Sequence, residues 1–203
     1  RRREPQDDLL THLAHVEDEG NTLSDEEFLA TCVTLLIAGH ETTTNLIGNG
    51  LMALLHHPIQ LQKLRDDLSL MPVAIEEMLR YEGPVHSVKR VTTEDVQMGE
   101  VVIPAGKLVY LVLASANRDS AHFNNPHQFN IQRTSEELRH IAFGYGIHFC
   151  VGAPLARLEA EIAFTSLFLR VKHIQLAGTP QWKRNMSIRG LETLPMHLFS
   201  ELN

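Results

Sequence analysis

The spacing of apolar residues along the chain predicts a mostly helical protein with short strands in its second half. Leu9, Leu13 and Val16 recur at helical intervals. Ser24 followed three residues later by Glu27 forms a capping box, which begins many helices, and Pro58 ends the helix that follows. Helices are expected over Asp7–Val16, Ser24–His57, Ile59–Asp67, Pro72–Tyr81 and Ala153–Arg170.

After Val85 the pattern changes to short β-rich runs that glycine and proline separate. A coil rich in asparagine, proline and phenylalanine covers Asn117–Arg133, and the apolar tail from Leu191 to Phe199 predicts a final hairpin. The order of helices, a small β-sheet and a further helix predicts a mainly α (α+β) fold with no domain boundary. Strands are expected over Val88–Val91, Val101–Ile103 and Leu108–Leu113.

Composition excludes several classes of protein. The 203 residues are 43% hydrophobic, enough for a buried core, and the net charge of −7 lacks the basic surplus that nucleic-acid binding needs. The two cysteines, Cys32 and Cys150, are too few for a disulfide scaffold and favour a reducing, cytoplasmic compartment. The most apolar run, Phe28–Gly39, is too short to span a bilayer, so no membrane partner is expected.

Cys150 lies in a loop whose composition suits metal chemistry. Gly144 and Gly146 permit the positive φ angles of tight turns, and Pro154 marks the first turn of the next predicted helix. The free N–H groups of a helix N-terminus favour a thiolate, which is what an electron-donating axial iron ligand requires. An inert, buried cysteine is the alternative. Cys32, in the middle of a predicted helix, is interpreted as a core residue.

The run from Phe143 to Gly152 resembles the haem-binding signature of the cytochrome P-450 family, Phe-Gly-x-Gly-x-His-x-Cys-x-Gly, at every fixed position. The resemblance implies the cytochrome P-450 fold, haem b as cofactor and Cys150 as the metal ligand, with Phe143 and Gly144 among the cofactor-binding residues. It covers the whole chain and is most similar to the soluble bacterial branch. Because the family's N-terminal half is missing, residues 1–203 are expected to be the C-terminal part of a single domain.

The segment from Ala38 to Thr44 breaks several helix rules at once. Gly39 costs about 1 kcal/mol against alanine inside a helix, and Thr42 is placed to bond back to the Ala38 carbonyl. A glycine packing point beside a solvent-facing glutamate is the alternative. The segment resembles the family's oxygen-activation motif, which implies that Thr42 hydrogen-bonds dioxygen, that Glu41 helps to supply protons, and that Ala38 and Gly39 adjoin the cofactor.

Glu77 and Arg80 lie three residues apart on one predicted helix face. An exposed ion pair worth under about 1 kcal/mol is one interpretation. The pair also resembles the family's Glu-x-x-Arg brace, which implies a third partner, an arginine from the coil before the cysteine loop. Arg133 lies at the matching place, and the brace would hold the coil that positions Cys150.

Other site residues follow from the resemblance alone. Arg90, in the first β-run, and His148, two residues before the cysteine, match positions that contact the haem propionates, which are anions that such donors suit. An exposed strand-edge arginine and a turn histidine are the alternatives. The segments Val85–Val88 and Leu191–Leu194 resemble those that line the family's substrate pocket.

Two functions are compatible with these features. The first is a haem-thiolate monooxygenase that acts on a small organic substrate with electrons from a separate ferredoxin or reductase. The second is a non-catalytic fragment that holds haem poorly or only after association with another chain, including a second copy. A peroxide-driven enzyme is disfavoured, because peroxide already brings the protons and electrons that Glu41 and Thr42 would manage.

The second function is motivated by the chain's beginning and by its apolar helices. The chain starts at Arg1 without a methionine, which favours a truncated or processed product. Apolar faces that the missing half covers in the family would then be exposed, and such patches usually drive association. These faces are expected at Phe28–Gly39 and at Leu155, Leu158, Ile162, Leu167 and Phe168.

Overall fold

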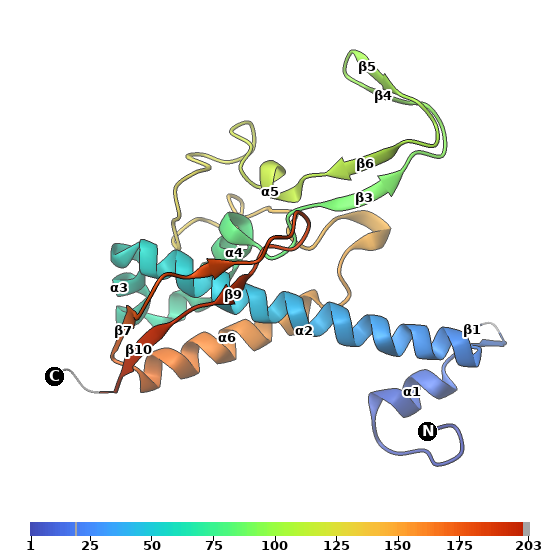
Figure 1. The fold of residues 1–203 in the computed structure, drawn as a ribbon, viewed down its shortest axis with the longest axis horizontal. Coiled ribbons are helices and arrows are strands. Elements are labelled where there is room, and N and C mark those ends of the chain that lie inside the picture. The colour runs from blue at the N-terminus through green and yellow to red at the C-terminus, as the bar shows by residue number, and fades with distance from the viewer. Residues whose placement is uncertain (19, 201–203) are drawn as a thin grey trace. The chain divides into compact units, whose positions relative to one another are not determined.

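A computed structural model describes residues 1–18 and 20–200 and divides the chain into two compact units, Arg1–Glu41 and Thr42–Asn203. Helix α2 (Asp25–His56) supplies residues to both units (Figure 1). The single domain expected over 1–203 stays a prediction. None of the described helices combines the length and the hydropathy needed to cross a bilayer.

The first unit is built from local hydrogen bonds. Asp8 caps α1 (Leu9–His15) by accepting a hydrogen bond from the backbone N–H of Thr11 at 2.8 Å. The Ser24 N–H donates to Glu27 Oε2 at 2.9 Å, and the Glu27 N–H donates to Ser24 Oγ at 3.2 Å. The capping box is therefore confirmed, and α2 begins where it predicts. The two short strands between the helices, β1 (Glu17–Asp18) and β2 (Asn21–Thr22), pair antiparallel.

The helices of the second unit fall close to their predicted places. Pro58 ends α2 and opens the next helix, and the last helix has the predicted bounds. The helical elements after α2 are α3 (Pro58–Asp66), η1 (Leu68–Leu70), α4 (Met71–Glu82), α5 (Leu113–Ala116), η2 (Gly146–His148) and α6 (Ala153–Arg170).

The core of this unit lies where α2, α4 and α6 meet (Figure 1). Gly50 on α2 makes the close approach possible, since a Cβ there would lie 2.6 Å from Met78 Sδ and 3.1 Å from Phe164 Cζ. A larger residue at position 50 would have to displace the side chains of Met78 and Phe164. The largest apolar side chains fully buried in this core are Leu46, Leu54, Leu64, Met71, Ile75, Met78, Leu79, Phe129, Ile131 and Phe164.

The strands of the second unit pair antiparallel, two by two, instead of forming one small sheet. Figure 1 shows β4 and β5 extending beyond the ends of β3 and β6. The predicted strand Leu108–Leu113 ends at Leu111, because Leu113 opens α5, and the strand β4 was not predicted. The pairs are β3 (Val88–Val91) with β6 (Leu108–Leu111), β4 (Val96–Met98) with β5 (Val101–Ile103), β7 (His173–Leu176) with β10 (Met196–Phe199), and β8 (Gln181–Trp182) with β9 (Leu191–Thr193).

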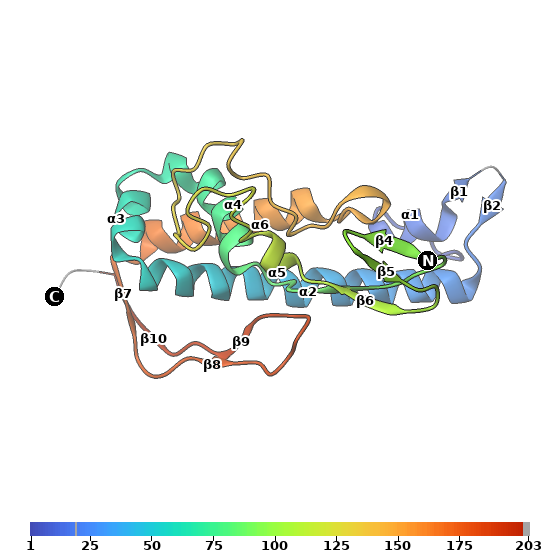
Figure 2. The same ribbon diagram turned by 90° about the horizontal axis from the view of Figure 1, so that it is seen from above.

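The prediction that the tail forms a hairpin by itself is wrong. The strands β9 and β10 do not pair with each other, since β9 pairs with β8 and β10 pairs with β7 (Figure 2). Along the chain, the pair of β8 and β9 lies inside the pair of β7 and β10. The tail is therefore one arm of a longer hairpin, and the turn of this hairpin lies between Trp182 and Leu191. Its other arm begins at His173, just after α6, and sequence reasoning left that arm out.

Two further expectations about burial need correction. On α6, Phe168 is buried in the core and Leu167 packs against it, so neither belongs to an uncovered face. Leu155, Leu158 and Ile162 on the same helix are each more than half exposed, as expected. Cys32 is half-buried and is not a core residue, because several of its neighbours on α2 face solvent.

Candidate functional site

The cysteine loop is closed by its own backbone. Gly144 and Gly146 adopt φ angles of +77° and +70°, the left-handed region that favours glycine. The Cys150 N–H donates to the Phe143 carbonyl at 3.0 Å, and the Phe149 N–H donates to the Gly146 carbonyl at 3.0 Å. These bonds fix Cys150 immediately before the N-terminus of α6.

The Cys150 side chain is exposed and lies among exposed apolar neighbours. Ile147 is 98% exposed and Val151 is 88% exposed, while Phe149 is about half exposed. Scattered apolar residues are common on surfaces, but here they flank a thiol within one short loop. The loop therefore presents one sulfur atom in an apolar setting.

This donor set fits a haem and does not fit a bare metal ion. In the part of the chain that the structure describes, no group of three or more histidine, cysteine, aspartate or glutamate side chains could hold a metal. Cys150 offers a single soft ligand, so an iron bound here must bring its remaining ligands with it, as the iron of a porphyrin does. Gly144 belongs to the same loop, and its φ of +77° is the constraint that favours glycine at this position.

The predicted charged brace is confirmed. Glu77 and Arg80 are fully buried, with Arg80 Nε 2.6 Å from Glu77 Oε2 and Arg80 Nη2 2.8 Å from Glu77 Oε1. Arg133 Nε lies 3.2 Å from both carboxylate oxygens of Glu77. The interpretation of Glu77 and Arg80 as an exposed surface pair is wrong, because both charges are buried and paired.

The brace holds the coil through its backbone carbonyls. Glu77 Oε1 also accepts a hydrogen bond from the Asn130 N–H at 2.8 Å. The coil is tied onward to the cysteine loop, because Asn117 Oδ1 accepts a hydrogen bond from the Ile141 N–H at 2.8 Å. Arg80 donates to the carbonyls of Asn117, Pro126 and Gln128, and Arg133 donates to those of Asn124, Asn125 and Gln128.

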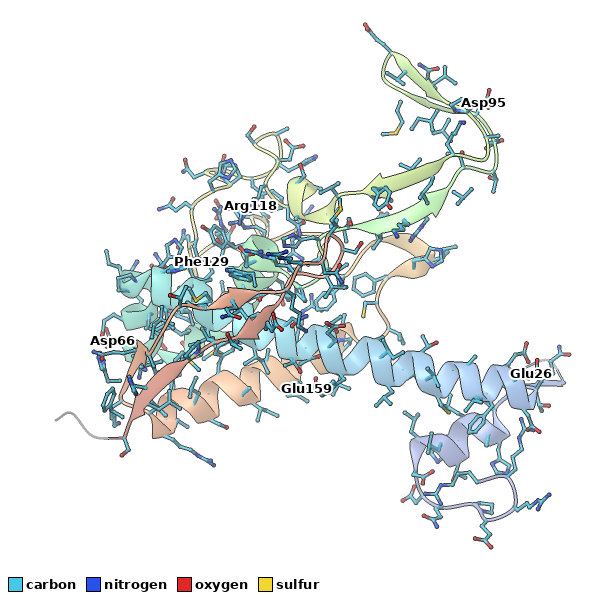
Figure 3. All side chains as sticks on the ribbon, in the orientation of Figure 1. Glu26, Asp66, Asp95, Arg118, Phe129 and Glu159 are labelled. Carbon is cyan, nitrogen blue, oxygen red and sulfur yellow. The ribbon has the colours of Figure 1, made fainter. Side chains whose placement is uncertain are left out.

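Aromatic packing supports the same coil from α4. The Phe129 ring lies 5.2 Å from the Tyr81 ring, and the Arg118 guanidinium lies 4.3 Å from the centre of the Tyr81 ring. Arg118 and Phe129 are labelled in Figure 3, where both side chains come from the coil beside α4. The segment that precedes the cysteine loop is thus fixed by buried charges and by rings.

Sequence reasoning missed a second ion network beside the first. Glu76 pairs with Arg157 of α6, with Nε 2.6 Å from Oε1 and Nη2 2.9 Å from Oε2, and with His140, whose Nε2 lies 3.1 Å from Oε2. Burial alone would raise the pKa of Glu76, but hydrogen bonds from His140 and Arg157 outweigh it and lower the pKa to about 2. The signal in the sequence was the acid next to Glu77, since adjacent helix residues point in different directions.

The remaining predicted residues lie as follows. Arg90 is exposed on β3 and donates to the Lys89 carbonyl at 2.8 Å, and His148 is exposed in η2. Glu41 and Thr42 are both half-buried on α2, where Glu41 ends the first unit and Thr42 begins the second. The structure unites Phe143, Gly144, His148 and Cys150 in one loop and places Ala38 and Gly39, both exposed, in the first unit.

The two segments expected to line a substrate pocket, residues 85–88 and residues 191–194, are connected through residues 186–189. Val85 forms an antiparallel bridge with Ile188, and the His86 N–H donates to the Ser187 carbonyl at 2.8 Å. The Arg189 N–H donates to the Pro84 carbonyl at 2.7 Å. Residues 85–88 thus lie against residues 186–189, which lead directly into β9.

The cytochrome P450 family model matches residues 1–195 of this chain. The chain belongs to the cytochrome P450 family. It is 51% identical over 200 residues to cytochrome P450 107B1 of Saccharopolyspora erythraea, covering 97% of this chain and 49% of that protein. It is also 51% identical over 195 residues to the cytochrome P450 monooxygenase PikC of Streptomyces venezuelae, covering 94% and 46%.

A solved structure agrees with these relatives. The cytochrome P450 PksS of Bacillus subtilis superposes with a TM-score of 0.93 at 44% identity, covering 98% of this chain and 52% of that chain. The predicted cytochrome P450 fold is therefore confirmed, and proteins of this family bind haem b. The chain spans about half the length of the curated relatives it matches.

Proposed function

We propose that this chain is part of a haem-thiolate monooxygenase that inserts one oxygen atom from dioxygen into a small organic substrate. The observation that carries the proposal is the loop around Cys150, which presents a single sulfur among apolar side chains on a P450 chain. The haem, when bound, supplies the activation of dioxygen. Electrons come from a separate ferredoxin or reductase, and the cytoplasm is the proposed location.

Cys150 is proposed to bind the iron as a thiolate. The hydrogen bond from its N–H to the Phe143 carbonyl fixes the backbone that carries the sulfur. The helix dipole of α6 begins just after Cys150 and favours negative charge at this end. Arg90 and His148, both exposed donors in the second unit, are assigned to the propionates, whose negative charge suits them.

Thr42 and Glu41 are proposed to manage protons. They are consecutive on α2 and both half-buried, so the hydroxyl and the carboxylate are partly shielded from water. In this role Thr42 holds a hydrogen bond to dioxygen and Glu41 passes protons toward it. Gly39, three residues before Thr42 on the same helix, adjoins open space, because a Cβ there would meet no atom within 4 Å.

The proposal is tested in the full-length protein with Thr42→Ala. Electrons would still be consumed, but a larger share would leave as hydrogen peroxide and a smaller share as product, because the hydroxyl that guides protonation is gone. Thr34→Ala is a matched control, since its hydroxyl donates to the Ala30 carbonyl within α2 at 2.7 Å. If coupling in Thr42→Ala equalled that of the control, Thr42 would have no part in the reaction.

The alternative function, a fragment that holds haem poorly or only after association, is favoured by one observation. Leu155, Leu158 and Ile162 form an exposed apolar row on α6, with spacings of three and four residues. A second copy is the proposed cover for this row. Light scattering and the haem-to-protein ratio of the isolated chain test this alternative, and a monomer with stoichiometric haem would exclude it.

A further inference from the structure

The Glu76 network lies between the helix that carries the brace and the helix that follows Cys150. Glu76 belongs to α4 and Arg157 belongs to α6, and both nitrogens of the arginine fork contact the carboxylate, at 2.6 and 2.9 Å. A bidentate pair of this kind fixes direction as well as distance. The Arg157 guanidinium is therefore held in one orientation relative to the start of α6.

His140 completes the network as a hydrogen-bond donor to Glu76. Its Nδ1 accepts a hydrogen bond from the Ala142 N–H at 3.2 Å, so Nε2 carries the proton and donates to Glu76 at 3.1 Å. The histidine is therefore oriented from both sides. Glu76 accepts hydrogen bonds from both Arg157 and His140. The negative charge of Glu76 balances the positive charge of Arg157, so this pair has almost no net charge.

Arg157 connects this network to the cysteine loop. Its guanidinium carbon lies 4.6 Å from the centre of the Phe143 ring, a cation–π contact. The Phe143 ring lies 6.4 Å from the Phe149 ring, and the Phe143 carbonyl accepts the hydrogen bond from the Cys150 N–H. A line of contacts thus runs from Glu76 through Arg157 and Phe143 to Cys150.

Arg157 also acts on Cys150 through its charge. The hydrogen bond to Glu76 is the largest cause of a raised Arg157 pKa; burial opposes it, and the charges of Glu76 and Cys150 raise it further. Arg157 is a cation that lies against Phe143, the residue whose carbonyl accepts the hydrogen bond from the Cys150 N–H. A cation near a metal centre favours the reduced form, which carries one more electron, and a carboxylate nearby does the opposite.

We propose that Arg157 is a positioning residue that holds Phe143 behind the thiolate and that, balanced by Glu76, sets the reduction potential of the bound iron. The inference rests on the proposed ligation of haem by Cys150. It assigns opposite electrostatic effects to the two members of one ion pair. A pair with only a structural role would lower haem retention in both variants without moving the potential in opposite directions.

The experiment measures the ferric/ferrous midpoint potential of the full-length holoprotein by spectroelectrochemical titration at pH 7. Arg157→Gln is expected to lower the ratio of reduced to oxidised iron at a fixed potential about fivefold, and Glu76→Gln to raise it by a similar factor. The double variant returns toward the wild-type ratio. Arg157→Lys keeps the charge and the wild-type ratio, while its haem is released more readily because the fork is lost.

Arg170→Gln is the matched control, since it removes an exposed arginine from the other end of the same helix and leaves the potential unchanged. Shifts of the same sign in both single variants, or no shift, would overturn the inference. So would loss of haem from both glutamine variants while Arg157→Lys kept haem. A wild-type protein without a thiolate-bound haem would instead refute the proposed function, so the two failures are distinguishable.

Discussion

The Glu77–Arg80–Arg133 brace and the Cys150 loop lie in the same unit, but the brace buries polar side chains and the loop exposes apolar ones. The brace buries three charges and satisfies them with one another and with backbone carbonyls. The loop exposes a thiol and apolar side chains that a protein normally buries. The brace satisfies its charges within the protein, whereas the loop leaves its thiol and its apolar side chains exposed. Rigid support beneath an exposed ligand is what a cofactor site requires.

The largest expected effect is on the brace. Arg80→Ala leaves the Glu77 carboxylate buried with only Arg133 to pair it and frees three coil carbonyls, so the free energy of unfolding should fall by about 3–5 kcal/mol. Chemical denaturation measures this, with exposed Arg170→Ala as a control expected to change it by about 0.5 kcal/mol or less. Glu77→Ala and Arg133→Ala should also lower haem retention in the full-length protein. Normal stability in any of these variants would show that the buried residue does not contribute to the stability of the fold.

The second effect is a dependence on pH that the Glu76 network causes. The pKa of Glu76 in the folded chain is about 2, below its ordinary value of 4.5, so folding favours the carboxylate. Its contribution, on the order of 2–3 kcal/mol, is complete above pH 4.5 and is lost as the pH falls from 4.5 toward 2. Glu76→Gln should flatten the unfolding free energy in that window. An unchanged slope would show that Glu76 is not paired in solution.

The third prediction compares two glycines at positive φ, one inside the cysteine loop and one outside it. Gly144→Ala and Gly106→Ala both place a side chain at positive φ, +77° and +74°, and each should cost about 1 kcal/mol of stability. Only Gly144→Ala should also reduce haem binding by the full-length protein, because Gly144 lies in the cysteine loop and Gly106 lies in the turn between β5 and β6. Thermal unfolding and haem titration distinguish the two. Equal haem binding by both variants would mean that the loop tolerates a change of shape.

The smallest effect on stability is expected in the loop itself. Val151 is 88% exposed, so Val151→Ser should change the unfolding free energy of the haem-free chain by about 0.5 kcal/mol or less. It should nevertheless weaken haem binding, because the apolar contact beside Cys150 is removed. Fluorescence quenching during haem titration measures the affinity. A stability loss without any change in haem affinity would place Val151 in the packing of the protein instead.

The elements that were predicted correctly are those whose sequence signals lie within the element itself. Helix α6 and the strands Val88–Val91 and Val101–Ile103 have the predicted bounds, and the capping box at Ser24 starts α2 as expected. The tail hairpin failed because the partners of β9 and β10 lie earlier in the chain, and a period of two does not say which strand pairs with which. Glu76 escaped notice for a similar reason, since its partners lie 64 and 81 residues away.

The candidate site also has features that residue patterns predicted and features that they did not reveal. The motif around Cys150 and the brace were recognisable as patterns of residue types, and the brace contacts are confirmed. The roles of Thr42, Glu41, Arg90 and His148 stay predictions, because they concern haem, dioxygen and protons, and contacts among the described side chains do not test them. Exposure of an apolar row on α6 was expected, but the burial of Phe168 depends on contacts with other elements of the core, which periodicity does not reveal.

The most direct test of the account replaces each cysteine in the full-length protein and records the absorbance of the reduced carbon monoxide complex. Cys150→Ala should abolish the band that gives the family its name, because Cys150 is the one cysteine among the described residues that lies in the loop proposed to hold the haem. Cys32→Ala should keep the band, since this half-buried cysteine lies on α2 outside the cysteine loop. A Cys150→Ala protein that kept the band would contradict the central claim that Cys150 is the haem ligand.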